Sequence, residues 1–405
     1  MERPYPVFTV SKKAEASLKN GHPWVFGEEV TEVSGGYNNG DIVDVRGPKG
    51  NYLGSGYVND NSKIRVRVIS DNANDRFDEA FYQRQIRYAV DYRRRVMGED
   101  FSCCRLVFGE ADRLPGLTVD RFGSVLVVQS LCLGTDLRKG IILPALVDYL
   151  RGLGEEIEAV YERNDAAIRK LEGMEEYKGF YASEGLRNDL DGHTEIIENG
   201  IRYDVDYING QKTGFFLDQK YNRLAVRRIA KDMSVLDCFT HTGAFALNAA
   251  MGGARKVTAV DISESAIAQA RANAERNGIE MEFITADVFD LLTELYEKRS
   301  REYDFIILDP PAFTKSSATA QSAYKGYKEI NMKAMRLLPR GGYLATCSCS
   351  HFMYDDMFRR MLSEAAHDAS VTLRQIEARQ QAPDHPIIPS IRETDYLKFY
   401  LFQVV

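Results

Sequence analysis

The chain has 405 residues, of which 44% are hydrophobic and 27% charged, as in a globular protein of two or three domains. No run of about 18 apolar residues occurs, and the N-terminal residues lack the apolar core of a signal peptide. We therefore expect no membrane span, a cytoplasmic location and reduced cysteines. The net charge of −7 excludes a chain coated in positive charge, but it allows a local basic face for nucleic acid.

The first two regions of the chain predict two small domains. Residues 1–71 hold short alternating runs divided by glycine and asparagine clusters, which predict a small β-barrel. In residues 72–190, an arginine-rich helix over 76–100 precedes strands and a further helix, which together predict an α+β domain ending in a polar linker. The polar side of that first helix is either an ordinary solvated surface or a surface that faces phosphates, and it carries Arg84, Arg87, Arg93, Arg94 and Arg95.

Residues 191–405 have a different texture, because strand patterns alternate with helical patterns. This alternation predicts an α/β fold with a doubly wound, Rossmann-like parallel sheet. One of the helices begins with Ser263 or Ser265 as its N-cap and closes on Gly278. Residues 395–405 are predicted to add an edge strand or a hairpin.

Each of five predicted strands in this region ends in a residue suited to binding or chemistry, namely Asp237, Asp261, Asp287, Asp309 and Cys349. Ligands of doubly wound sheets bind at the carboxyl ends of the strands. One aspartate there is ordinary turn chemistry, but four in successive units indicate a binding site. The first turn lacks the G-x-G-x-x-G pattern, so a pyrophosphate has no cradle.

The spacing of these acids points to a nucleoside ligand. Asp261 follows Asp237 by 24 positions, and an acid about 20 residues along binds ribose hydroxyls in such folds. A ribose without a pyrophosphate indicates S-adenosylmethionine, and Asp287 would then face the adenine amino group. Pro310 and Pro311 stiffen the next strand end, where a flat base can dock on free carbonyl groups.

The motifs DCFTHTGAF, VDISESAI, ADVFD, LDPPAFTKS and TCSCSHF together resemble class I S-adenosylmethionine-dependent RNA methyltransferases, in the order found in the RlmI family of 23S rRNA cytosine-5 methyltransferases. GHPWVFGEEV and the run from Gly40 to Asn59 resemble the N-terminal PUA barrel of that family. VFGEADRLPGLTVDRFG resembles its middle domain, GQKTGFFLDQKYNR the segment before its catalytic core, and APDHPI a segment near its C-terminus. The resemblance covers essentially the whole chain.

The resemblance implies where the cofactor binds. The expected residues at its methionine side, ribose and adenine are Asp237, Phe239, Thr240, Gly243, Asp261, Ser263, Asp287 and Val288. Gln219 is expected to reach the cofactor from the preceding segment, or else to be an ordinary helix N-terminal residue. His241 in the first turn is expected to be structural or a neighbour of the cofactor.

Methylation at cytosine C5 requires a nucleophile, because C5 becomes reactive only after a thiolate adds to C6. The family motif places that thiol between two serines, which is Cys349, and an acid at N3 is expected at Asp309. Cys347 would point to the same side of the strand one step deeper, as a small core residue. The alternative is that both thiols are buried beside a base-binding pocket.

Other polar and aromatic residues keep two interpretations. Related enzymes with a second cysteine use it for release, but Ala312 stands at that position, so another base must take the C5 proton. His351 is a candidate base or a surface residue, and His385 a weaker candidate for the active site. Trp24 either stacks on a base or anchors the barrel core.

The sequence therefore predicts a methyltransferase domain preceded by a PUA-type β-barrel and an α+β middle domain, with 23S rRNA or a large-subunit assembly intermediate as partner. Cys103 and Cys104 lack the companion ligands of a metal site, and a homodimer is a candidate assembly. One alternative is a base-nitrogen methyltransferase acting on guanine or adenine, although Ala312 replaces the aromatic residue typical of amino methylation. Another is an RNA-binding module that has lost catalysis.

Overall fold

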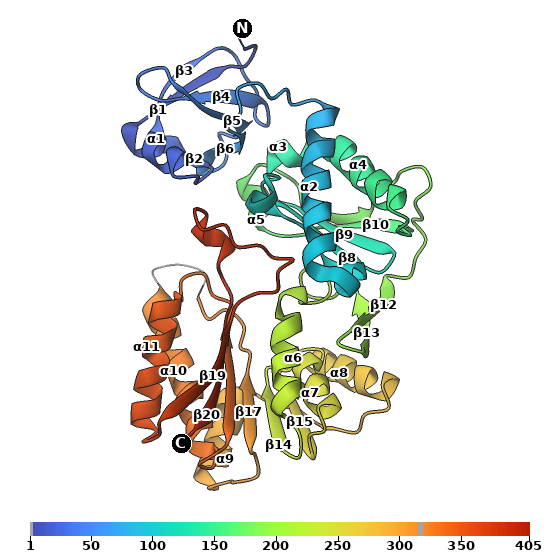
Figure 1. Cartoon of the computed structure of the whole chain (residues 1–405), viewed down its shortest axis with the longest axis vertical. Coiled ribbons are helices and arrows are strands. Elements are labelled where there is room, and N and C mark those ends of the chain that lie inside the picture. Colours follow the sequence, from blue (N-terminus) through green and yellow to red (C-terminus); the bar gives the residue numbers. More distant parts are fainter. Residues whose placement is uncertain (1–2, 315–318) are drawn as a thin grey trace. The chain divides into compact units, whose positions relative to one another are not determined.

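The computed structural model of the chain describes residues 3–314 and 319–405 (Figure 1). The chain divides into two compact units that interleave along the sequence. Unit 1 comprises Met1–Ile196, Asp204–Leu217 and Pro383–Thr394, and unit 2 comprises Ile197–Tyr203, Asp218–Ala382 and Asp395–Val405. The three-domain division at residues 71 and 190 stays a prediction. The last two residues of the LDPPAFTKS motif, at positions 315 and 316, lie outside the described residues.

The first part of unit 1 is a six-stranded sheet with strand order β2-β6-β5-β4-β1-β3. Its elements are β1 Val7–Val10, α1 Lys12–Lys19, β2 Trp24–Phe26, η1 Gly27–Glu29, β3 Val30–Ser34, β4 Ile42–Arg46, β5 Tyr52–Val58 and β6 Ile64–Ser70. Five strands and α1 contribute to a single apolar core, as expected of a small barrel. Trp24 is not part of that core. Its Nε1 donates to the Glu110 carboxylate at 3.0 Å, so the expectation of a barrel-core anchor is wrong.

The second part of unit 1 is a five-stranded sheet with strand order β11-β10-β9-β8-β7. Its strands are β7 Cys103–Phe108, β8 Leu117–Phe122, β9 Val125–Ser130, β10 Ala159–Asn164 and β11 Tyr177–Phe180. Its helical elements are α2 Glu79–Met97, η2 Gly98–Ser102, η3 Gly109–Asp112, α3 Leu133–Asp136, α4 Lys139–Gly152 and α5 Ile168–Leu171. The arginine-rich helix α2 begins after Asp78, whose side chain caps the Phe81 amide, and it is shorter than predicted at both ends.

The arginines of α2 do not form one solvated face. Arg93 is fully buried, which contradicts its predicted place on the polar side. Its guanidinium donates to the Asp112 carboxylate at 2.8 Å and to the main-chain carbonyl of Asp384 at 3.1 Å. Arg84 bonds Asp75 at 2.8 Å, whereas Arg87, Arg94 and Arg95 are exposed.

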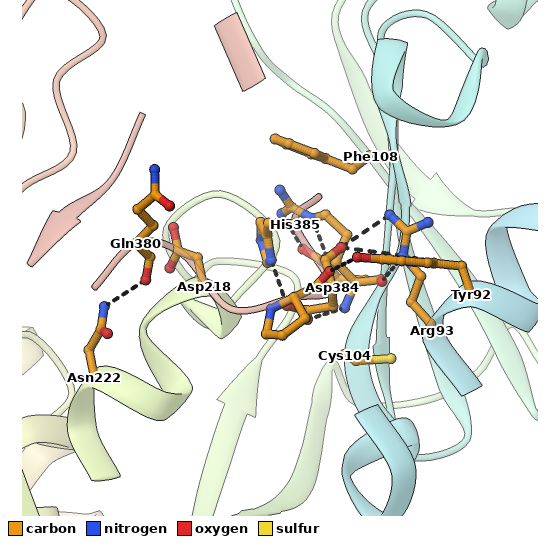
Figure 2. Close-up of polar contacts among 12 residues, drawn as sticks. Tyr92, Arg93, Cys104, Phe108, Asp218, Asn222, Gln380, Asp384 and His385 are labelled. Atoms are coloured by element: carbon orange, nitrogen blue, oxygen red, sulfur yellow. Dashed lines mark hydrogen bonds and ion pairs between the residues drawn. The ribbon is translucent and has the colours of Figure 1, made fainter. Parts of the chain in front are cut away.

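Residues Pro383–Thr394 lie between β19 (Leu373–Arg379) and β20 (Lys398–Val404) in the chain and belong to unit 1. Figure 2 shows Asp384 and His385 of this segment with Tyr92, Arg93 and Phe108. Besides the Arg93 contact, the Asp384 carboxylate accepts from the Arg105 amide at 2.8 Å, and the Tyr92 hydroxyl donates to the Pro383 carbonyl at 3.0 Å. The buried His385 ring bonds the Asp384 carboxylate at 2.8 Å and packs against Phe108. His385 therefore holds this segment in place within unit 1.

Unit 2 contains a seven-stranded sheet with strand order β16-β15-β14-β17-β18-β20-β19. Its strands are β14 Ser234–Cys238, β15 Lys256–Asp261, β16 Glu282–Thr285, β17 Phe305–Leu308, β18 Tyr343–Ser348, β19 Leu373–Arg379 and β20 Lys398–Val404. The first five are parallel, and β20 runs antiparallel to both of its neighbours. The sequence predicted an edge strand or hairpin over 395–405, but the edge is β19, and β20 lies inside the sheet.

Helices cover both faces of this sheet (Figure 1). The α-helices of unit 2 are α6 Lys220–Ile229, α7 Ala244–Met251, α8 Glu264–Arg276, α9 Val288–Glu297, α10 Ala320–Leu337 and α11 Asp355–Asp368. The short helix η4 Leu217–Gln219 spans the division between the units in the sequence, and η6 Arg392–Thr394 belongs to unit 1. Alternate strand residues face opposite cores: Val235 and Ile307 pack with α6 and α7, whereas Leu236 and Leu308 pack with α9, α10 and α11. This confirms the doubly wound α/β prediction. Ser263, not Ser265, caps α8.

A two-stranded sheet, β12 His193–Glu198 and β13 Ile201–Asp206, precedes the seven-stranded sheet in the chain. The strand β12 begins inside residues 183–195, the polar stretch SEGLRNDLDGHTE that the sequence predicted to be a linker. The division into units passes through both strands.

Replacing Arg93 by methionine should lower the free energy of unfolding of unit 1 by about 3–5 kcal/mol, because Asp112 would keep a buried charge without its partner. Trp24 is the single tryptophan and lies in unit 1, so its fluorescence during urea unfolding reports this change. The matched control, Arg94→Met, removes an exposed arginine and should change stability by less than about 0.5 kcal/mol. Equal urea midpoints for the two variants would contradict the assigned role of Arg93.

Candidate active site

Parallel pairing brings the predicted site residues to one edge of the unit 2 sheet. Asp237 of β14 is in register with Ala259 of β15 and Ile307 of β17. Asp261 is the last residue of β15, and Asp309 and Cys349 directly follow β17 and β18. The site residues named from different strands are therefore neighbours at the carboxyl edge, where ligands of such sheets bind.

The turn after β14 has an unusual backbone. Phe239 and His241 both have positive backbone φ angles, of 64° and 50°, which residues other than glycine rarely adopt. Strained turns of this kind are concentrated at functional sites. Gly243 has φ +83°, and a Cβ there would lie 3.0 Å from the Cβ of Ala270, so the turn also needs glycine for close packing against α8. The amide of Thr240 donates to Val260 of the neighbouring strand at 2.9 Å.

Asp237 is fully buried beneath this turn. Its Oδ2 accepts from the Thr240 hydroxyl at 2.6 Å and from the Ala246 amide at 3.0 Å, but its Oδ1 has no partner among the described residues. The pKa of Asp237 is raised to about 7, mainly by burial and in part by the charges of Asp309 and Asp261. A buried carboxylate oxygen without a donor fits the amino group of a methionine moiety, which would supply that donor.

Asp261 joins two turns at the same edge. Its Oδ2 accepts from the His241 amide at 2.9 Å and its Oδ1 from the Ser263 amide at 3.0 Å. Each oxygen keeps a further lone pair, so both fit the hydroxyls of a ribose. The Ser263 hydroxyl caps α8 through the Ala266 amide, which gives this serine a structural role at the site.

Asp287 and Val288, the two residues predicted at the adenine, both have structural roles. The Asp287 carboxylate caps α9 by accepting from the Phe289 amide at 2.8 Å. The Val288 side chain is buried in the core, so only its main chain is able to meet an adenine. Sequence reasoning missed Ile262, which directly follows Asp261 and is 67% exposed. An exposed apolar side chain beside the ribose acid is suited to pack on adenine, and its position after Asp261 was the available signal.

Gln219 contacts Asp309, the predicted catalytic acid. Its Nε2 donates to Oδ1 of Asp309 at 3.0 Å, and its Oε1 accepts from Asn222 at 2.6 Å. The amide is therefore oriented by α6 and in turn orients Asp309. Burial raises the pKa of Asp309 to about 6, and the negative charge of Asp218 adds to this effect. At neutral pH a fraction of Asp309 therefore carries a proton.

The two cysteines of the TCSCSHF motif have different surroundings. Cys347 is fully buried on β18 among the residues that pack with α6 and α7, where burial raises the pKa of its thiol. The strand ends at Ser348, so Cys349 lies one residue beyond it. Of the six cysteines, Cys349 alone is partly exposed.

Two further side chains lie near Cys349. His351 is exposed, and its ring centroid is 5.4 Å from that of Tyr396. Lys398 of β20 is buried, and its Nζ donates to the carbonyls of Ser350 at 2.8 Å and Tyr396 at 2.7 Å. Sequence reasoning missed Lys398, although a lysine inside the apolar run YLKFYLF was a visible signal.

Residues 3–314 and 319–405 show neither a cluster of metal ligands nor a membrane-spanning helix. No group of three or more histidine, cysteine, aspartate or glutamate side chains there is placed to hold a metal ion. No helix in the same ranges has the length and apolarity needed to cross a membrane.

Comparison with known proteins agrees with this geometry. The family of S-adenosylmethionine-dependent methyltransferases matches residues 128–403, and a PUA-like domain matches residues 8–71. The ribosomal RNA large subunit methyltransferase I of Klebsiella pneumoniae (strain 342) is 39% identical over 405 residues, covering 99% of each chain. The chain belongs to this methyltransferase family. The enzyme of the same name from Cronobacter sakazakii is 40% identical, covering 98% of each chain.

Solved structures show the same fold. A protein described as a SAM-dependent methyltransferase, from Streptococcus mutans, aligns with a TM-score of 0.81 at 21% identity over 98% of this chain and all of its own. A methyltransferase solved in complex with SAH aligns with a TM-score of 0.82 at the same identity. S-adenosylmethionine is accordingly the cofactor of this family member, and the orphan oxygen of Asp237 and the open lone pairs of Asp261 fit it.

Replacing Asp261 by alanine should weaken S-adenosylmethionine binding roughly 10- to 100-fold, because hydrogen bonds to a charged acceptor contribute about 1.5–3 kcal/mol each. Isothermal titration calorimetry measures the dissociation constant directly. Glu275→Ala removes an exposed acid from α8 and serves as the control, for which binding should be unchanged. An unaltered dissociation constant in the Asp261 variant would remove this residue from the site.

Proposed function

We propose that this methyltransferase forms 5-methylcytosine in 23S rRNA, either free or in a large-subunit assembly intermediate, through a covalent adduct of Cys349. The observation that carries the proposal is that the single partly exposed cysteine follows β18 at the site edge, where Asp309, with its raised pKa, follows the adjacent strand β17. The relatives from Klebsiella and Cronobacter, whose names specify ribosomal RNA of the large subunit, support the choice of substrate. Because ribosomal RNA is the substrate, we also propose a cytoplasmic location.

The thiolate of Cys349 adds its electron pair to C6 of the cytosine, the C5–C6 π electrons move to form a C4–C5 double bond, and the C4–N3 π electrons move onto N3, so that an enamine nucleophilic at C5 results. Asp309, in its protonated form, donates a proton to N3 as negative charge develops there. Bound S-adenosylmethionine supplies an electrophilic methyl group on its sulfonium. N3 then returns its proton to Asp309, and loss of the C5 proton to a base re-forms the C5–C6 double bond and expels the Cys349 thiolate, which restores both the aromatic ring and the enzyme.

The environment of Asp309 supports its role as an acid. A carboxylate with an ordinary pKa is almost completely ionised at pH 7, whereas a pKa of about 6 keeps about a tenth of the molecules protonated. Gln219 holds one carboxyl oxygen through its amide, and we propose that the other oxygen meets N3 of the base. His351, exposed and two residues beyond Cys349, is our candidate for the base that removes the C5 proton.

We propose that the PUA-like barrel and α2 hold the RNA backbone, while the target base leaves its stack to reach Cys349. Three arginines of α2 are exposed: Arg87, Arg94 and Arg95. Tyr88 beside them is 56% exposed, with the Arg87 guanidinium 5.5 Å from its ring centroid. Exposed arginines with an exposed aromatic ring are the side chains that bind phosphates and stack on bases.

Cys349→Ala should abolish methylation but leave the fold and the affinity for S-adenosylmethionine unchanged. Cys347→Ala is the matched control, since it removes the buried thiol and should cost about 1 kcal/mol of stability while activity is retained. Methyl transfer from radiolabelled cofactor to 23S rRNA measures activity, and bisulfite sequencing shows whether cytosine is the modified base.

A 5-fluorocytidine substrate traps the adduct, because fluorine at C5 prevents the final proton loss. The wild-type protein should form a denaturant-resistant complex with such RNA, and Cys349→Ala should form none. Loss of activity in the Cys347 variant instead would mean that the deeper thiol is the nucleophile. Normal methylation by the double variant would exclude covalent catalysis and favour methylation of a base nitrogen.

Reversing the charge of Arg87, Arg94 and Arg95 together to glutamate should weaken RNA binding at least tenfold and should lower the salt dependence of binding by roughly two in log–log slope. Filter binding at several salt concentrations measures both quantities. A control triple variant at Arg228, Arg271 and Arg374 changes the net charge equally on exposed residues of unit 2. Equal losses in the two variants would show that only total charge matters.

A further inference from the structure

Lys398 occupies an unusual place for a lysine. It is the first residue of β20, and antiparallel pairing with β18 sets it opposite Ser348, the residue directly before Cys349. Its neighbours Leu397 and Phe399 are fully buried, and Lys398 itself is only 5% exposed. The lysine of β20, a strand inside the sheet, therefore lies beside the end of β18, which the proposed nucleophile Cys349 directly follows.

A buried ammonium requires compensation, because removal of its charge from water is costly. Lys398 receives only part of it from its two hydrogen bonds, which run to the carbonyls of Ser350 and Tyr396. An ammonium has three N–H donors, and the two carbonyls accept from only two of them, so one N–H donor remains. Within the described residues no carboxylate forms an ion pair with Lys398, which distinguishes it from the buried cation Arg93.

Two carboxyl groups and one thiol interact electrostatically with the lysine without a direct bond. Asp395 precedes β20, Asp355 begins α11 and accepts from the Tyr400 hydroxyl, and Cys349 follows β18. Their negative charges favour the ammonium, but burial is the larger effect and lowers the pKa of Lys398 to about 8. At pH 7 most molecules therefore still carry the positive charge.

We infer that Lys398 is a positioning residue for Cys349, whose ammonium stabilises the thiolate while its two carbonyl bonds fix the backbone that bears the thiol. The inference rests on the proposed function, in which Cys349 is the nucleophile. The thiol proton passes to solvent water, Lys398 stays protonated, and the thiolate uses its electron pair for C6. When the thiolate is expelled, the same cation stabilises it again, so one charge assists both formation and cleavage of the adduct.

The inference differs from a purely structural role, in which Lys398 would only hold the chain through its carbonyl bonds. Both roles predict damage when the side chain is removed. Only stabilisation of the thiolate predicts a change in the pH at which Cys349 becomes reactive. Because the other five cysteines are buried, iodoacetamide should label Cys349 selectively in the folded protein, and this needs neither RNA nor cofactor.

The experiment measures the alkylation rate of Cys349 against pH, with peptide mass spectrometry to identify the labelled residue. In Lys398→Gln, which keeps N–H donors for the carbonyls but removes the charge, the midpoint should rise by about one pH unit, and the rate at pH 7 should fall about tenfold. The rate at high pH, where the thiolate is complete, should stay near that of the wild type. Lys398→Arg keeps the charge and should retain the wild-type midpoint within about threefold in rate at pH 7.

Lys333→Met is the matched control, because this partly buried lysine of the same unit bonds Thr293 and Glu329 and should leave the profile unchanged. A wild-type midpoint in Lys398→Gln would overturn the inference and leave Lys398 a structural residue. If the glutamine variant does not fold, a midpoint in Lys398→Arg shifted by a full pH unit would also overturn it. The proposed function fails separately, through normal methylation by Cys349→Ala.

Discussion

The parallel pairing of β14 with β15 and β17 is the constraint on which the site depends. Parallel strands end at the same edge, so residues far apart in the chain meet there without any direct bond between their own segments. Asp237, Asp261 and Asp309 become neighbours in this way. The charges of Asp261 and Asp309 contribute to the raised pKa of Asp237, and Asp261 also accepts from the His241 amide in the turn after β14. The apolar cores on both faces of the sheet hold the strand ends in place, and catalytic side chains need such a rigid support to keep their geometry.

Burial then gives similar groups different roles. Asp237 is fully buried with one oxygen left for a ligand, whereas Asp261 has both oxygens tied to backbone amides. Asp309 is held by Gln219 and has a raised pKa, which suits an acid. Cys347 and Cys349 show the same principle: one thiol is kept in an apolar core, and the other is partly exposed where the strand stops.

Unit 1 is stabilised by buried charge as well as by apolar packing. Arg93 binds Asp112 and the Asp384 carbonyl, and Arg105 binds the buried Asp120 carboxylate at 2.7 Å. Both networks join residues that are distant in sequence. The Arg93 network holds the segment after β19, and the Arg105 bond holds β7 to β8 in the five-stranded sheet. The remaining exposed arginines of α2 are thereby left for solvent or for a polyanion.

The sequence by itself determined the doubly wound fold, the order of its strands along the chain and the residues at their ends, because hydrophobic period and turn residues are local properties. The sequence narrowed the cap of α8 to Ser263 or Ser265, and the structure decided for Ser263. Only the tertiary structure decided that Arg93 is buried, that β19 rather than β20 is the edge, and that Trp24 lies outside the barrel core. It also placed Lys398 opposite Ser348 and Gln219 against Asp309. These facts depend on pairing between distant segments, and a local pattern carries no information about the partner that a side chain will meet.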